Sequence, residues 1–156
     1  FPPRPSSDLG SYDHGQGELS DAASALDWMQ TYNANAGQCW IAGFSFGAWI
    51  AMQLLMRRPE IPGFISIAPP ANLYDFSFLA PCPSSGLIIQ GTADDLVPEA
   101  DVQKLATRLS HQRDIRIEYR KVQGAGHFFE DEIEELSSMV EGYLRKAMAA
   151  AAAAAS

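Results

Sequence analysis

The sequence is poor in cysteine, in positive charge and in long apolar runs. Its 156 residues include only two cysteines, Cys39 and Cys82, which form no metal or redox motif and are typical of a reducing compartment. Lys and Arg number 11 against 19 Asp and Glu, which disfavours nucleic acid and anionic membranes as partners. No apolar run approaches the roughly 18 residues of a membrane span. We therefore expect a cytoplasmic location.

The remaining composition is that of an ordinary folded domain. The chain is 47% hydrophobic and 19% charged, and its length suits a single domain. We assign this domain to residues 1–148. Residues 149–156, seven alanines and a serine, resemble a tag and are excluded from fold reasoning. No signal peptide is visible, although Phe1 is not a natural start, so that one could have been removed.

Short apolar runs alternate with amphipathic segments along the chain. Strands are predicted for the runs at 39–42, 64–68 and 87–90 and for the alternating pattern at 115–120. Helices are predicted for residues 19–30, 48–58, 98–109 and 133–144. This alternation predicts an α/β fold, a three-layer sandwich around a mainly parallel sheet, with 115–120 as a half-exposed edge strand. The excursion at 71–85 is expected over the carboxyl edge of the sheet.

One short motif carries a specific chemical prediction. Gly43-Phe44-Ser45-Phe46-Gly47 fits the G-x-S-x-G pattern and stands between a predicted strand and a predicted helix. Side chains at Gly43 and Gly47 would collide with the neighbouring strand and helix. The tight turn lifts the Ser45 hydroxyl above the sheet, and the Phe46 amide points to where an oxyanion would form. Alternatively, Ser45 simply caps the helix that follows.

A serine hydroxyl needs a base, so the loops after later strands are informative. Asp94 and Asp95 lie in the loop "GTADDLVP" after the strand at 87–90, and His127 lies in "QGAGHFF" after the last strand. The order Ser, Asp, His is that of an α/β-hydrolase triad. Alternatively, the two aspartates are turn and cap residues before Pro98, and His127 is an ordinary loop histidine. His14 and His111 have no partner pattern and are expected to be solvated.

With "GFSFG", "GTADDLVP" and "GAGHFF" in place, the chain resembles the α/β-hydrolase superfamily, in particular small dienelactone-hydrolase-like esterases. The resemblance implies Ser45 as nucleophile, His127 as general base and Asp94 as the acid, with Asp95 as the alternative. Dienelactone hydrolases use cysteine as the nucleophile, so serine favours ordinary ester hydrolysis. Such chemistry needs no metal or cofactor, and the absence of a visible lid favours short acyl chains.

Aromatic residues cluster around these motifs. We expect four of them to line the substrate pocket, although aromatic residues more often belong to a core: Phe44, Trp49, Phe76 and Phe128.

The resemblance also implies that part of the fold has no counterpart here. The family's early strands are missing from the sequence, and with them the loop that normally donates the second oxyanion N–H. The strand at 39–42 would therefore have an unpaired edge, which we expect the N-terminal segment or a second copy to cover. A homodimer through this edge is the resulting prediction. The alternative function is a non-catalytic or partner-dependent fragment of a hydrolase scaffold.

Overall fold

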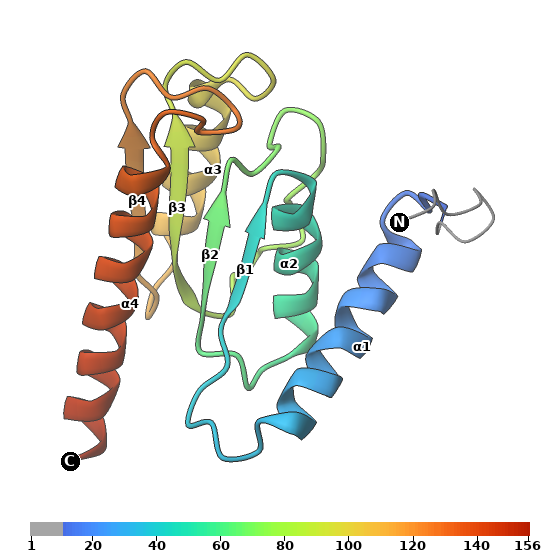
Figure 1. The fold of residues 1–156 in the computed structure, drawn as a ribbon, viewed down its shortest axis with the longest axis vertical. Coiled ribbons are helices and arrows are strands. Elements are labelled where there is room, and N and C mark those ends of the chain that lie inside the picture. The colour runs from blue at the N-terminus through green and yellow to red at the C-terminus, as the bar shows by residue number, and fades with distance from the viewer. Residues whose placement is uncertain (1–10) are drawn as a thin grey trace, which may run out of the picture.

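Four parallel strands, paired in the order in which they occur along the chain, organise the protein (Figure 1). The computed structural model describes residues 11–156. In chain order, the elements are α1 (Gln16–Tyr32), β1 (Ile41–Phe44), α2 (Phe46–Arg57), β2 (Gly63–Ile67), β3 (Ser85–Gly91), α3 (Glu99–Ser110), β4 (Ile117–Val122) and α4 (Ile133–Ala155). The predicted α/β class with a mainly parallel sheet is confirmed.

The sheet is covered by helices on both faces, because successive side chains of a strand point to opposite sides. Phe64 and Ile88 point to the face that packs against α2 and α3. Ile65, Leu87 and Ile89 point to the other face, which α4 covers (Figure 1). The predicted three layers result. The α4 residues that pack against this second face are Leu136, Met139, Val140, Tyr143 and Leu144.

An edge strand was predicted at 115–120, and within the described residues β4 is the last strand of the sheet, paired with β3, although it spans Ile117–Val122. The first strand was expected at 39–42, whereas β1 spans Ile41–Phe44. It extends into the glycine motif because Gly43 pairs with Ser66 and Phe44 with Ile67 of β2. Pairing with a neighbouring strand, which a local apolar pattern does not reveal, thus determines where β1 ends.

The connection between β2 and β3, which was expected over the carboxyl edge of the sheet, also contributes side chains to the core. Its residues Phe76, Leu79 and Cys82 are buried in the same core cluster as the inner face of α3. Arg108 donates a hydrogen bond to the Phe76 carbonyl at 2.9 Å, and Gln112 donates one to the Leu79 carbonyl at 3.0 Å. The connection therefore forms part of the core.

The alanines of the C-terminal segment continue α4, which runs to Ala155. Alanine has the strongest intrinsic preference for the helix, so this extension needs no further contacts. The assignment of residues 149–156 to a tag-like tail stays a prediction.

The helix α1 lies beyond β1 and packs on α2 (Figure 1). Leu19 of α1 is buried against Ile50 and Leu54 of α2. At the other end, Arg58, which directly follows α2, donates to Asp27 at 2.7 Å and to Gln30 at 2.6 Å of α1. Within residues 11–156, no helix combines the length and the apolar character that crossing a membrane requires.

The outer edge of β1 has no strand partner in the described part of the chain, where β1 pairs with β2 alone. A mostly apolar hollow of about 420 Å³ follows this edge between α1 and α2. Ile41, Ala42, Phe46 and Gly47 are among its lining residues. The two predicted covers are a second copy of the chain and the N-terminal segment, of which residues 1–10 lie outside the described residues.

Pairing through the β1 edge predicts a dimer that a charge at the edge would break. Ala42 is exposed on β1, so Ala42→Lys would place an ammonium group where a second strand has to approach. By sedimentation, we expect the unmodified chain at twice 17.0 kDa and Ala42→Lys at 17.0 kDa. Ala34→Lys, at an exposed position in the loop before β1, is the matched control and should stay dimeric. A monomer at every concentration would contradict the prediction.

Candidate active site

Ser45 occupies a strained turn between β1 and α2. Its φ of 54° and ψ of −125° place it in a region that non-glycine residues rarely adopt. The Ser45 amide donates a hydrogen bond to the Ile67 carbonyl at 2.9 Å, which ties the turn to the end of β2. The hydroxyl makes no capping hydrogen bond to α2. The helix-cap alternative for Ser45 therefore has no support in the structure.

The two glycines of the motif differ in what surrounds them. A Cβ atom on Gly43 would lie 2.6 Å from the Ala48 Cα atom and would also meet the Gly47 carbonyl. The prediction of a collision is confirmed at Gly43. At Gly47 it is wrong, because a Cβ built there meets no described atom within 4 Å apart from its chain neighbours and the backbone of its own helix. Gly47 instead lines the hollow beside the unpaired edge of β1.

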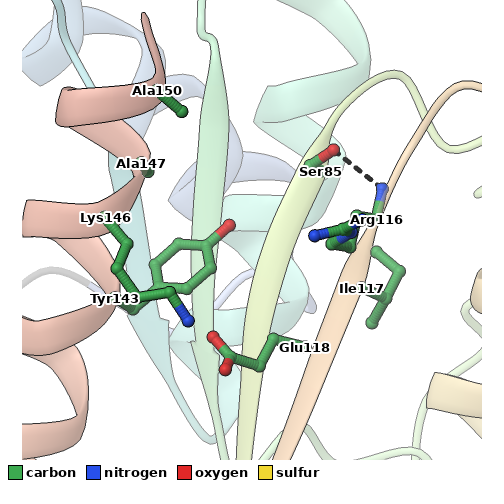
Figure 2. A pocket seen from close by; sticks show the side chains of 8 residues that line it. All are labelled: Ser85, Arg116, Ile117, Glu118, Tyr143, Lys146, Ala147 and Ala150. Atoms are coloured by element: carbon green, nitrogen blue, oxygen red, sulfur yellow. Dashed lines mark hydrogen bonds between the residues drawn. The ribbon is translucent and has the colours of Figure 1, made fainter.

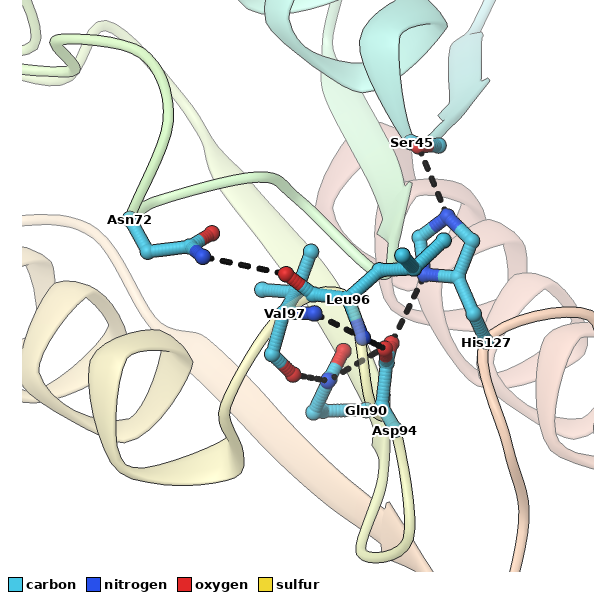
Figure 3. Close-up of polar contacts among 7 residues, drawn as sticks. All are labelled: Ser45, Asn72, Gln90, Asp94, Leu96, Val97 and His127. Carbon is cyan, nitrogen blue, oxygen red and sulfur yellow. Dashed lines mark hydrogen bonds and ion pairs between the residues drawn. The ribbon is translucent and has the colours of Figure 1, made fainter.

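Ser45, His127 and Asp94 form one continuous chain of hydrogen bonds (Figure 3). The distance from Ser45 Oγ to His127 Nε2 is 2.8 Å, and the distance from His127 Nδ1 to Asp94 Oδ2 is also 2.8 Å. The Asp94 and His127 side chains are 0% and 7% exposed. Asp95, the sequence-based alternative, is exposed, so the structure brings Asp94 rather than Asp95 to His127. This arrangement can pass a proton from Ser45 to His127 while Asp94 orients the ring.

The loops that carry Asp94 and His127 are held against each other by hydrogen bonds. The Ala93 amide donates to the Ala125 carbonyl at 3.0 Å, and the Gly124 amide donates to Thr92 Oγ1 at 2.8 Å. This approach requires glycine at position 91, where a Cβ would lie 2.9 Å from the Ala125 carbonyl carbon. The pairing of β3 with β4 therefore continues into the two loops of the site.

The Asp94 carboxylate accepts hydrogen bonds on both oxygens. Its Oδ1 accepts from the amides of Leu96 at 2.9 Å and Val97 at 2.8 Å. Its Oδ2 accepts from His127 and, at 3.1 Å, from the Gln90 side chain (Figure 3). Gln90 was not identified as a site residue from the sequence. The available signal was a single polar letter in the apolar run of β3.

Two of the four predicted pocket aromatics flank His127. The Phe44 ring lies 5.1 Å from the His127 ring, and the Phe128 ring lies edge-on to it at the same distance. Both rings are available to a ligand, because Phe44 is 40% and Phe128 is 62% exposed. Trp49 is half-buried and stacks on Tyr74 at 4.4 Å. A substrate contact for these residues stays a prediction.

Phe76 differs from the other predicted pocket residues. It is 4% exposed, belongs to the core cluster with α3, and stacks on Phe78 with ring centroids 6.1 Å apart. Its backbone carbonyl is held by Arg108. The structure therefore assigns Phe76 to the core, which was the alternative to a place in the substrate pocket.

Phe46 stands at the first position of α2, directly after Ser45. Amides of a first helical turn have no partner inside the helix, and the oxyanion role of the Phe46 N–H stays a prediction. The Phe46 ring packs on Tyr12 at 5.6 Å and on Tyr74 at 5.7 Å. The hydroxyls of Tyr12 and Tyr74 lie 3.2 Å apart, and this hydrogen bond raises the pKa of Tyr12. The sequence offers no signal for this pair.

One further hollow lies at the end of the sheet opposite to Ser45. A hollow of about 460 Å³ lies between α4 and the start of β3 and β4, at the amino ends of the strands (Figure 2). Its lining includes Ser85, Arg116, Glu118 and Tyr143, and burial raises the pKa of Tyr143. His14 and His111 are exposed. Among residues 11–156, no three His, Cys, Asp or Glu side chains gather in a way that could hold a metal ion.

Comparison with known proteins identifies the family. A sequence profile of the dienelactone hydrolase family matches residues 10–156. The chain belongs to the dienelactone hydrolase family. An uncharacterized protein of Rickettsia prowazekii (strain Madrid E) is 54% identical over 139 residues, which cover 86% of this chain and 58% of that protein.

Solved structures of related hydrolases share the fold. A protein of unknown function from Agrobacterium tumefaciens, suggested to be an α/β hydrolase, is 58% identical with a TM-score of 0.87, and the match covers 91% of this chain and 65% of that one. A serine hydrolase without a lid from Xanthomonas campestris is 32% identical with a TM-score of 0.78, over 88% of this chain and 60% of that one. The chain thus spans about three fifths of the length of these relatives.

The contrast between the two motif glycines predicts opposite effects of the same substitution. Gly43→Ala forces a methyl group against the backbone of α2 and should lower the free energy of unfolding by about 2 kcal/mol or more. Gly47→Ala has open space and should change it by less than about 1 kcal/mol. Urea unfolding followed by circular dichroism measures both. Equal losses in the two variants would contradict the prediction.

Proposed function

We propose that the protein hydrolyses small carboxylic esters with Ser45 as nucleophile, His127 as general base and Asp94 as the residue that orients His127. The observation that carries this proposal is the chain of two 2.8 Å hydrogen bonds from Ser45 to Asp94. Membership of a hydrolase family and likeness to serine hydrolases support the reaction class. Serine at the nucleophile position favours ordinary esters over the substrates of the family's cysteine enzymes.

The first half-reaction forms an acyl-enzyme. Ser45 Oγ attacks the acyl carbon while its proton moves to His127 Nε2, and Asp94 stabilises the resulting imidazolium. The negative charge develops on the former carbonyl oxygen, which the Phe46 N–H can stabilise at the start of α2. His127 then gives the proton to the leaving alkoxide, and the alcohol departs.

The second half-reaction returns the enzyme to its starting state. Water gives a proton to His127 and attacks the acyl carbon, and Ser45 Oγ leaves and recovers the proton. An oxyanion hole normally has two donors, and losing one lowers turnover by about 10²–10³-fold. Phe46 is the donor proposed here, and a hole with this donor alone would turn over more slowly by about that factor.

The proposal predicts that turnover depends on Ser45. Purified chain should hydrolyse p-nitrophenyl acetate, and Ser45→Ala should lower kcat by about 10³-fold or more. Ser66→Ala is a matched control, because its hydroxyl is buried on the adjacent strand without a hydrogen-bond partner among the described residues. Labelling of Ser45 by a fluorophosphonate would show an activated serine even where ester turnover is slow.

Equal rates in the unmodified chain and in Ser45→Ala, together with no labelling, would overturn the proposal. The alternative would then take its place, namely a non-catalytic fragment or one that needs a partner to act. This alternative has one supporting observation, since the match covers 58% to 65% of the first two relatives described above.

The flanking aromatics supply a proposal about the substrate. Phe44 and Phe128 present exposed rings beside His127, which suits a small acyl or alcohol group packed against them. Trp49 is proposed as a further substrate-contacting residue, because its ring packs beside that of Phe46, the residue next to Ser45.

Phe128→Ala should raise KM for p-nitrophenyl esters by about 3- to 10-fold and leave stability unchanged, because the ring is 62% exposed. Trp28→Ala, which removes an exposed ring from the far part of α1, is the control and should leave KM unchanged. An unaltered KM in Phe128→Ala would exclude the ring from the substrate site.

The same proposal includes the place where the protein acts. Cys39 and Cys82 are both free thiols, which suits the reducing environment of the cytoplasm. We propose a small-molecule ester as the ligand, and the net charge of −8 disfavours nucleic acid and anionic membranes as partners.

A further inference from the structure

Gln90 is a polar side chain in the most deeply buried strand of the sheet. It is 0% exposed, follows the apolar residues Leu87, Ile88 and Ile89 of β3, and precedes the loop that carries Asp94. Its Oε1 atom has no hydrogen-bond partner among the described residues. Burying an amide with an unpaired oxygen is unfavourable, so an apolar residue would be expected here on stability alone.

The amide nitrogen of Gln90 makes two hydrogen bonds. It donates to Asp94 Oδ2 at 3.1 Å and to the Val97 carbonyl at 2.8 Å (Figure 3). Both partners are acceptors only, so the NH₂ group must face them, and the opposite amide orientation would bring Oε1 against two oxygens. The chemistry of the neighbours therefore determines which way the Gln90 amide points.

These bonds anchor the Asp94 carboxylate to the sheet. The amides of Leu96 and Val97 also bind Asp94, but they belong to the same loop and move with it. Gln90 donates from β3, to the same oxygen that accepts from His127 Nδ1. The second bond, to Val97, fixes the far end of the loop to the same amide.

We propose that Gln90 is a positioning residue, whose amide holds Asp94 Oδ2 in line with His127 Nδ1. It touches neither the substrate nor the reacting atoms. Its effect on turnover rests on the proposed function, whereas its effect on the His127–Asp94 hydrogen bond does not. The Gln90 amide, with its unpaired Oε1, orients Asp94 and does not improve the packing of β3.

The test replaces the amide while keeping its volume. Gln90→Met removes both hydrogen bonds and should lower kcat for p-nitrophenyl acetate by about 10- to 100-fold, with KM changed by less than about twofold. Gln90→Glu keeps the shape of glutamine but places a second carboxyl group beside Asp94, so the loss should be at least as large. If Gln90→Met does not unfold cooperatively, Gln90→Glu decides.

Ile88→Val is the matched control. Ile88 lies on the same strand and is 1% exposed, and its apolar side chain cannot donate a hydrogen bond to Asp94. It should lower stability slightly and leave kcat unchanged. A folded Gln90→Met or Gln90→Glu that retains kcat within about threefold would overturn the inference. A rise in KM as large as the fall in kcat would overturn it as well.

A second readout separates this inference from the proposed function. The His127 Nδ1–H proton, assigned by its loss in His127→Gln, is followed by proton NMR. In Gln90→Met it should exchange faster with water, because Asp94 is less firmly held, and its chemical shift should change. An unchanged resonance would overturn the inference. If the unmodified chain shows no Ser45-dependent turnover, the proposed function fails, and the resonance still tests the role of Gln90.

Discussion

The parallel pairing of strands in chain order is the constraint on which the site depends. Parallel strands end at the same edge of a sheet, so the turns after β1, β3 and β4 come together. This brings Ser45 into hydrogen-bond contact with His127, which is 82 positions away. Four strands suffice for this geometry, because each contributing strand lies within the ordered set from β1 to β4.

Close approach of backbone segments at the carboxyl edge of the sheet fixes the positions of the loops that carry the site residues. At Gly43 the turn presses on the start of α2, and at Gly91 the loop after β3 presses on Ala125. Neither position leaves room for a Cβ atom, so these contacts act through the rigid backbone rather than through adaptable side chains. The two loops therefore approach to distances at which Asp94 and His127 can bond directly.

The sequence predicted those features that repeat along the chain or follow a strand. Alternation of apolar runs and amphipathic helices identified the fold, and the positions of Asp94 and His127 after strands identified their shared edge. Contacts between segments that are distant in the sequence could not be predicted from it. The Tyr12–Tyr74 pair joins residues 62 positions apart. Phe76 was predicted to line the pocket, because its burial against α3 cannot be inferred from the residues around it in the sequence. Gln90 escaped notice because one polar letter in an apolar run has no periodicity.

Ser45 and Asp94 are held by different physical means. The strained conformation of Ser45 costs about 1–3 kcal/mol. The next helix, α2, buries Met52, Leu54 and Leu55, and full burial of each such side chain contributes about 1.5–3 kcal/mol. Packing of α2 therefore exceeds the strain and fixes the nucleophile through the core. Asp94 has no helix of its own and sits on a loop, so its orientation depends on hydrogen bonds, of which the one from Gln90 connects it to the sheet. The two ends of the Ser45–His127–Asp94 chain thus differ in sensitivity, since a change in the core acts on Ser45 and the loss of a single donor acts on Asp94.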